Sequence, residues 1–258
     1  MIKITRTPEP DILKQNKQQW TQTLVDLIDE HGSYANIPNN EKNNAIQHYR
    51  HEEIKQDIQA FSYDKCVYCE SKISHVASSH IEHFYPKSLY PQGTFDWENL
   101  FLACPSCNQS KGNFDTKQNL IVNPAKDNPE DFFIYRDLML EPIPDSPDKQ
   151  KSQQTITACD LNRVVLVRQT AEIYCQLLDN KERLSESLSE YFELKKDFAK
   201  EKRLLRIRNA VDNLRLLAQD QESYAGFVRY FIYKSKHGEP IRKAIELIKS
   251  NDAQNDFI

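Results

Sequence analysis

Hydrophobic residues recur at helical spacing at both ends of the 258-residue chain, whereas the middle of the chain follows a different pattern. Near the start, the repeating residues are Trp20, Leu24, Leu27 and Ile28. They fall on one side of a helix with 3.6 residues per turn. The polar stretch HGSYANIPNN, residues 31–40, then indicates a turn. We therefore predict a helical N-terminal segment over residues 1–60.

The helical period returns after residue 160 and continues through the last third of the chain. The residues that carry it are Leu161, Val164, Val165, Ile173, Leu177, Leu184, Leu188, Tyr191, Phe192, Leu204, Val211 and Leu214. Such stripes usually form the buried or partner-facing side of helices. We therefore predict a C-terminal helical region over residues 155–258.

Between residues 61 and 145, short apolar runs alternate with turn residues. Trp97 and Phe101 are expected in the core of this region. The run DFFIYRDLMLEPI, residues 131–143, predicts a β-hairpin or two short strands. The stretch PDSPDKQKSQQ, residues 144–154, is rich in Pro, Asp, Ser and Lys, and it is the best candidate for a linker before the C-terminal region.

The overall charge gives no sign of nucleic-acid binding, because the formal net charge is −4 and charged residues make up 28% of the chain. A phosphate-binding surface would have to be local. The best candidate is residues 195–215, with eight Lys or Arg against three Asp or Glu. The basic residues that follow it are Arg229, Lys234, Lys236, Arg242 and Lys243. A solvated helix face is the alternative interpretation.

The sequence contains no apolar run of about 18 residues, the length that a membrane-spanning helix needs. The first residues, MIKITRTPEPDILKQ, also lack the apolar core of a secretion signal. We expect a soluble, cytoplasmic protein without a membrane partner. The sequence has five glycines and no GxxxxGK[ST] motif, so any use of ATP or GTP would need a nucleotide site on another chain.

Four of the six cysteines form two CxxC pairs, Cys66 with Cys69 and Cys104 with Cys107. Two intervening residues let both thiolates of a pair face one tetrahedral ion, and four sulfurs close its coordination sphere. We therefore predict a structural Zn²⁺ site. The segment between the pairs, residues 70–103, is longer than in a usual zinc ribbon. The other two, Cys159 and Cys175, are expected to be buried apolar residues.

The segment between the cysteine pairs contains SHIEHFYPKS, residues 79–88, in which His80, Glu82 and His83 lie close together. Three interpretations are open from the residues alone: a metal site, a catalytic site, or a polar turn beside the zinc.

The longer pattern resembles a known nuclease family. IEHFYPKS followed by FDWENLFLACPSCNQSKGN is similar to the HNH motif of the ββα-metal nucleases. With KCVYCE before it and TITACDLNR after it, the chain resembles a narrower group over about residues 49–170: PtuB, the HNH nuclease subunit of Septu-type and retron-associated antiphage systems. The resemblance implies an α+β, mostly helical fold, with a zinc-stapled ββα-metal module between N-terminal helices and a C-terminal helical region.

The resemblance also implies roles for individual residues. His83 would be the general base, and Glu82 and Asn108 would hold a catalytic Mg²⁺ or Mn²⁺. Asn99 would orient His83 through a hydrogen bond. Many family members have Asp in place of Glu82 and His in place of Asn108, and the residues present here favour hard cations that prefer oxygen ligands.

Other polar residues near the motif have two interpretations each. His80 could be a further ion ligand or phosphate contact, or a solvated strand histidine. Lys111 and Lys87 could each contact phosphate or lie on the protein surface. His75 is expected in a loop.

The predicted function is a metal-dependent HNH endonuclease that acts on DNA or RNA, including transfer RNA. The resemblance implies an ABC/SMC-like ATPase partner, PtuA, and in retron-associated systems a reverse transcriptase and its msDNA. The alternatives are a stand-alone restriction-type DNA nuclease and a non-catalytic zinc-stapled binding module.

Overall fold

The computed structural model describes residues 1–73 and 80–255, so the expected loop at His75 lies outside the described residues. Helices predominate, and the described strands form two small two-stranded sheets. This confirms the predicted α+β, mostly helical class. The chain divides into two compact units. The N-terminal unit is Met1–Ile134 with Leu140–Asn162, and the C-terminal unit is Tyr135–Met139 with Arg163–Ile258.

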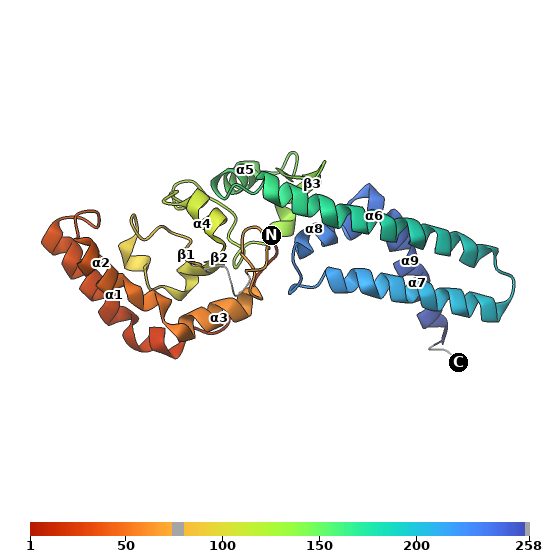
Figure 1. Cartoon of the computed structure of the whole chain (residues 1–258), viewed down its shortest axis with the longest axis horizontal. Helices are drawn as coiled ribbons and strands as arrows, with labels where there is room; N and C mark the ends of the chain where they lie inside the picture. Colours follow the sequence, from red (N-terminus) through yellow and green to blue (C-terminus); the bar gives the residue numbers. More distant parts are fainter. Residues whose placement is uncertain (74–79, 256–258) are drawn as a thin grey trace. The chain divides into compact units, whose positions relative to one another are not determined.

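Figure 1 follows the elements along the chain. The first helices are α1 (Asp11–His31), α2 (Asn39–Ile46) and α3 (Glu52–Ser62), with a 3-10 turn at Gln47–Arg50 before α3. Strands β1 (His80–His83) and β2 (Leu100–Ala103), helix α4 (Pro105–Lys111), strands β3 (Phe133–Arg136) and β4 (Met139–Pro142), and helix α5 (Lys149–Ala158) come next. The C-terminal helices are α6 (Val164–Glu193), α7 (Asp197–Leu217), α8 (Ala225–Arg229) and α9 (Glu239–Asn255).

The helices predicted in the first 60 residues are present, and local sequence explains where they begin and end. Helix α1 follows Pro10, which favours the first turn, and ends at Gly32, whose φ of 75° is a left-handed conformation that glycine adopts easily. Helix α3 is capped by His51, whose ring accepts a hydrogen bond from the backbone N–H of Glu53. Ile54 and Ile58 of α3 are fully buried, and α3 contacts β2.

Strands β1 and β2 pair antiparallel, with Glu82 opposite Phe101 and His83 opposite Leu100. Strand β2 leads through Cys104 directly into α4, so the order is strand, strand, helix. Phe101 and Trp97 are buried, as predicted. The guanidinium of Arg6 lies 4.1 Å from the centre of the Phe101 ring and donates to the Trp97 carbonyl at 2.8 Å. The N-terminal residues therefore help to hold the ββα module in place.

The predicted linker at residues 144–154 is wrong, because α5 begins within it and belongs to the N-terminal unit. Ser152 and Thr155 of this helix are fully buried. The Ser152 hydroxyl donates to the carbonyl of Asp148, and the Thr155 hydroxyl accepts from the backbone N–H of Val122 at 2.8 Å. Hydroxyls that find such partners can be buried, so a polar stretch was mistaken for an exposed one.

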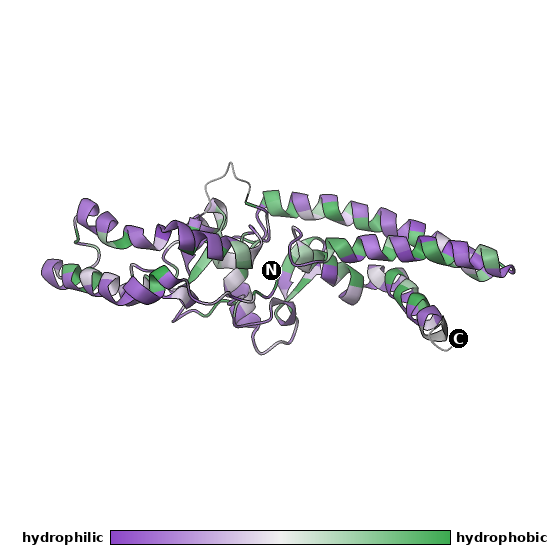
Figure 2. Ribbon diagram, turned by 90° about the horizontal axis from the view of Figure 1, so that it is seen from below, coloured by the Kyte–Doolittle hydropathy of each residue, from purple (hydrophilic) through white to green (hydrophobic). Residues whose placement is uncertain are grey.

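The C-terminal unit is built around a hydrophobic core of its own. The buried residues that form it include Leu177, Leu184, Leu188, Ile207, Val211, Leu214, Phe227, Phe231, Ile241 and Ile248. Figure 2 shows hydrophilic and hydrophobic residues alternating along α6 and α7, as expected for helices with one buried face. Four residues of the predicted stripe do not join this core. Leu161 is buried but belongs to the N-terminal unit, and Val164, Val165 and Phe192 are 82%, 61% and 70% exposed.

The two isolated cysteines differ in their surroundings. Cys159 is fully buried, as predicted, whereas Cys175 is exposed on α6, so that prediction was wrong. The helical period does not place Cys175 on the side that carries Leu177 and Leu184.

None of the helices in residues 1–73 and 80–255 is long and apolar enough to cross a membrane.

The basic run at residues 195–215 lies mostly in α7, where several of its arginines contact acidic side chains of the same unit. Arg208 donates to both carboxylate oxygens of Asp252, at 3.0 and 2.6 Å. Arg215 pairs with Asp212 at 3.0 Å. These pairs favour the interpretation of a solvated helix face for this run.

Candidate active site and four-cysteine cluster

The four paired cysteines come together, as their spacing predicted. Their sulfur atoms all lie within 4.8 Å of one another, and Cys69 and Cys104 are separated by 3.8 Å. A tetrahedral Zn²⁺ with zinc–sulfur bonds of about 2.3 Å would hold its sulfurs about 3.8 Å apart. All six cysteines are among the described residues, and none forms a disulfide. The cluster is therefore consistent with a structural zinc site.

The cluster joins three parts of the ββα module: the segment of the first cysteine pair, strand β2 and helix α4. The backbone N–H of Val67, between the first two cysteines, donates to the carbonyl of Leu102 in β2 at 3.0 Å. The sulfur of Cys104 caps α4 by accepting from the backbone N–H of Cys107 at 3.4 Å. The cysteine pairs therefore fix both ends of the segment that contains β1.

Strand β1 places His83 in a pocket of about 560 Å³ within the N-terminal unit. The His83 side chain is buried, and its Nε2 lies 3.0 Å from the carbonyl oxygen of Thr94. Because a carbonyl only accepts, Nε2 must carry the proton, which leaves the lone pair of Nδ1 as an acceptor. The edge of the Tyr49 ring packs on the His83 ring, with centres 4.7 Å apart. Burial, with a smaller contribution from Lys87, lowers the pKa of His83 to about 3.

Glu82 is also buried, and its carboxylate has two close partners. The Nζ of Lys111 lies 2.5 Å from Oε1 of Glu82, and the hydroxyl of Tyr68 donates to the same oxygen at 3.3 Å. Burial raises the pKa of Glu82, and the ammonium of Lys111 opposes that shift.

Lys111 is buried, so the predicted interpretation as a surface lysine is wrong, and the interpretation as a phosphate contact stays a prediction. Its side chain is fully buried, and Nζ also donates to the carbonyl of His83 at 2.9 Å. Helix α4 packs against β1, and Lys111 in its last turn therefore faces the strand. The ammonium replaces water for two oxygen atoms of β1, which is how a buried lysine is tolerated.

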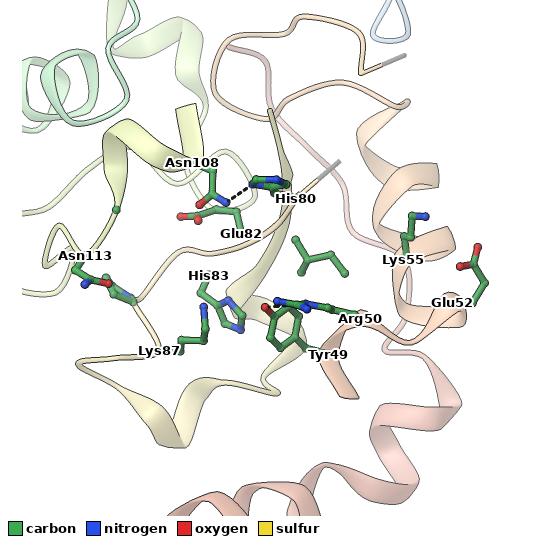
Figure 3. Close-up of a pocket in the computed structure, with 13 residues that line it drawn as sticks. Tyr49, Arg50, Glu52, Lys55, His80, Glu82, His83, Lys87, Asn108 and Asn113 are labelled. Atoms are coloured by element: carbon green, nitrogen blue, oxygen red, sulfur yellow. Dashed lines mark hydrogen bonds between the residues drawn. The ribbon is translucent and has the colours of Figure 1, made fainter. Parts of the chain in front are cut away.

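His80 and Asn108 contact each other across the pocket. The side-chain nitrogen Nδ2 of Asn108 lies 3.0 Å from Nδ1 of His80, and both residues are half-buried. In Figure 3, Asn108, Glu82 and His80 lie close together at one end of the pocket. The sequence motif therefore brings Glu82, His83 and Asn108 into one pocket, and His80 supports Asn108. His80 is a half-buried strand residue that contacts Asn108, and its role as an ion ligand or phosphate contact stays a prediction.

Asn99 does not contact His83 in the way that the resemblance implied. Its Oδ1 accepts from the backbone N–H of Tyr85 at 2.6 Å, and its Nδ2 donates to the carbonyls of Tyr85 and Gly93 at 3.1 and 2.8 Å. Asn99 thus joins the two ends of the loop between β1 and β2. Because that loop supplies the Thr94 carbonyl, Asn99 acts on His83 through the loop backbone.

Four residues from the segment before the motif also line the pocket: Tyr49 and Arg50 of the 3-10 turn, and Glu52 and Lys55 of α3. Arg50, Lys55 and Lys87 bring three positive charges to the pocket lining, and Glu52 brings a negative charge (Figure 3). Sequence reasoning missed them, because nothing in residues 1–60 indicates which polar side chains will face the motif.

Comparison with known proteins agrees with this geometry. Residues 66–114 match the HNH endonuclease family. The chain is 40% identical to Septu protein PtuB of Bacillus thuringiensis over 77 residues, which is 30% of each chain. It is 24% identical to Septu protein PtuB of Bacillus mycoides (strain KBAB4) over 203 residues, or 67% of each chain. The predicted resemblance is confirmed: the chain carries an HNH endonuclease domain and is homologous to Septu protein PtuB.

Proposed function

We propose that this HNH endonuclease hydrolyses phosphodiester bonds in DNA or RNA with His83 as its general base. The observation that carries the proposal is the 3.0 Å hydrogen bond between Nε2 of His83 and the carbonyl of Thr94. That bond keeps the proton on Nε2 and leaves Nδ1 able to take a proton from water. His83 lines the pocket, so a phosphodiester bound there can meet the activated water.

The side chains beside His83 fit a hard divalent ion, Mg²⁺ or Mn²⁺. Such ions prefer oxygen ligands, and the Glu82 carboxylate and the Asn108 amide oxygen line the same pocket. The contacts from Lys111 and Tyr68 both reach Oε1 of Glu82, so we assign Oε2 to the ion. When bound, the ion would neutralise negative charge on the scissile phosphate and on the leaving oxygen.

Three cations line the pocket and suit the substrate backbone. Arg50 is exposed, and Lys55 and Lys87 are half-buried, so each can reach a phosphate oxygen. Phosphate contacts of this kind hold the strand but do not read its bases. The sequence preference of the nuclease must therefore come from other contacts.

We assign Zn²⁺ to the four-cysteine cluster in a structural role. Four thiolates complete the coordination of zinc and leave no position for water. The ion would stabilise the ββα module, whose own apolar core is small.

We further propose that the chain is the nuclease subunit of an antiphage complex with an ABC/SMC-like ATPase, PtuA. The support is the homology to Septu protein PtuB. In a retron-associated system the complex would also contain a reverse transcriptase and its msDNA.

Cleavage by purified protein tests the nuclease proposal directly. Wild type, His83→Ala and the control His31→Ala would be incubated with plasmid DNA and with total RNA in Mg²⁺ or Mn²⁺, with and without the ATPase. His31 lies at the end of α1, outside the pocket. Removing a positioned base costs roughly two to four orders of magnitude in rate. Cleavage by His83→Ala at the wild-type rate would contradict the assignment of the general base.

A further inference from the structure

The C-terminal unit contains a second pocket, of about 480 Å³, formed where five of its segments meet. These are the end of β3 with the turn that follows it, helix α6, helix α8, a π-helical turn at Tyr230–Lys234, and a 3-10 turn at Lys236–Gly238. The lining residues are Tyr135, Arg136, Asp137, Leu138, Tyr174, Phe227, Tyr230, Phe231, Lys234, Ser235, Lys236 and His237. None of them belongs to the pocket around His83.

Aromatic rings form much of the lining of this second pocket. Of the lining rings, Phe227 and Phe231 are buried, whereas Tyr174, Tyr230 and His237 are half-buried. The His237 ring stacks on Phe231 with centres 6.2 Å apart and planes inclined by 10°. Tyr174 meets His237 edge-on, with centres 5.9 Å apart. Each half-buried ring is therefore packed against another ring of the lining and keeps part of its surface exposed.

The π-helical turn and the 3-10 turn beside the pocket are held by a side-chain contact from Arg242 and by close packing at Gly238. A π-helical turn leaves carbonyls without their usual partners, and such turns often occur at functional sites. Here Nη1 of Arg242 donates to the carbonyls of Ile232 and Ser235, at 2.8 and 3.0 Å. A Cβ at Gly238 would lie 2.3 Å from the carbonyl oxygen of Ile232, so glycine is required where the next turn crosses. This packing fixes Lys236 and His237 at the edge of the pocket.

The charges at the pocket are mainly positive. Arg136, Lys234 and Lys236 are all exposed cations of the lining, and Asp137 is its single carboxylate. Rings that stack on bases, combined with cations that contact phosphates, are the usual means by which proteins hold single-stranded nucleic acid.

We propose that this pocket binds a nucleotide, with its base against the half-buried rings and its phosphate near Lys236. The nucleotide can be free or part of a nucleic-acid strand, because both offer the same chemistry. The inference does not depend on catalysis at His83. A peptide segment of a partner protein would fit the rings, but the excess of positive charge favours a phosphate-bearing ligand.

The test uses the full chain with His83→Ala, so that an oligonucleotide is bound but not cut. Binding of a short fluorescent single strand is measured by fluorescence anisotropy for this protein alone and with Lys236→Glu, Tyr174→Leu or Lys249→Glu added. Lys249 is an exposed lysine of α9 that does not line the pocket, so it controls for the same change of charge. AMP and ATP are added as competitors to separate a free nucleotide from a strand.

We expect Tyr174→Leu to weaken binding roughly 5-fold to 100-fold, the usual effect of losing one stacked ring. Lys236→Glu should also weaken binding and reduce its salt dependence, while Lys249→Glu changes affinity less than twofold. Because Tyr174 also packs on the core, its variant is interpreted only if its thermal unfolding is unchanged, and Lys236→Glu provides the independent test.

A photo-crosslink from a bromouridine-containing strand locates the site. Crosslinked peptides that contain Tyr174 or Tyr230 would support the proposal. Crosslinks confined to residues 66–114, or equal effects of Lys236→Glu and Lys249→Glu, would overturn it, as would unchanged affinity in Lys236→Glu. Competition by AMP or ATP for the Lys236-dependent binding identifies a free nucleotide as the ligand, and competition by strands alone identifies nucleic acid.

Discussion

Replacing Lys111 by methionine would remove the charge that accompanies Glu82 in the interior. Both side chains are almost completely buried, and Nζ lies 2.5 Å from Oε1 of Glu82. Methionine keeps most of the volume of the side chain but leaves the carboxylate with only the hydroxyl of Tyr68, 3.3 Å away. The change therefore tests whether the ammonium stabilises the carboxylate or is only tolerated beside it.

The expected loss of stability is large. Removing one partner of a buried ion pair costs about 3–5 kcal/mol, and for a unit of this size that lowers Tm by roughly 6–20 °C. Differential scanning calorimetry in chelator-treated buffer without added Mg²⁺ or Mn²⁺ would measure the change. The control is Lys126→Met, an exposed lysine of the same unit, for which we expect at most about 0.5 kcal/mol.

A second substitution identifies the cause of the loss. If the unpaired carboxylate is responsible, adding Glu82→Gln to Lys111→Met should recover at least half of the lost stability. Mg²⁺ or Mn²⁺ should also raise the Tm of Lys111→Met more than that of wild type, because the ion would replace the missing charge. A Lys111→Met protein with the Tm of wild type would refute the reasoning, and so would a double variant no more stable than Lys111→Met.

The same loss should depend on pH. Burial already raises the pKa of Glu82, and Lys111 opposes that shift, so its removal raises the pKa further. The unfolded-state pKa of a glutamate is about 4.3. When the folded-state pKa is higher than this, the stability of the folded state decreases as the pH rises from the unfolded-state pKa to the folded-state pKa. The difference in stability between wild type and Lys111→Met should therefore be greatest at neutral pH and decrease as the pH is lowered toward 4.3. Unfolding curves collected across this range would measure it.

Three further substitutions probe the rest of the N-terminal unit. Arg50→Ala should lower kcat/KM roughly 10-fold to 100-fold through loss of a charged phosphate contact. The control Arg168→Ala, at an exposed site of α6, should leave kcat/KM unchanged. Steady-state cleavage assays measure kcat/KM for both variants. Asn108→Ala should lower the cleavage rate in Mg²⁺, and a titration with excess Mn²⁺ should restore part of it, because the ion site is weakened but not removed. Cys69→Ser should abolish zinc in elemental analysis and destabilise the N-terminal unit, while Cys175→Ser, at an exposed cysteine, should alter neither.

Sequence reasoning succeeded where the chemistry depends on short spacing. Two residues between paired cysteines were enough to predict the four-sulfur cluster, and the order of motif residues was enough to bring Glu82, His83 and Asn108 to one pocket. The same motif predicted a hydrogen bond from Asn99 to His83, but the partners of the Asn99 side chain are Tyr85 and Gly93.

The failures involve contacts between segments that are distant in sequence. The partner of Lys111 depends on how α4 crosses β1, and the approach of Arg50 depends on how the N-terminal helices pack. Helix α5 was missed because Ser152 and Thr155 look like linker residues until their hydroxyls find partners. No local pattern contains such information.

Helix α4 has only seven residues, too few to be stable alone in water. Cys104 caps its first turn, which carries Cys107, and the helix also supplies Asn108 to the pocket and Lys111 to the Glu82 carboxylate. Oxidants that convert these thiolates to sulfenic acid or disulfide would therefore also displace the amide and the ammonium. The protein should lose cleavage activity in peroxide at the rate at which it releases zinc to a colorimetric chelator, although no cysteine lines the pocket around His83. Activity that outlasts zinc release would show that α4 keeps its place without the metal.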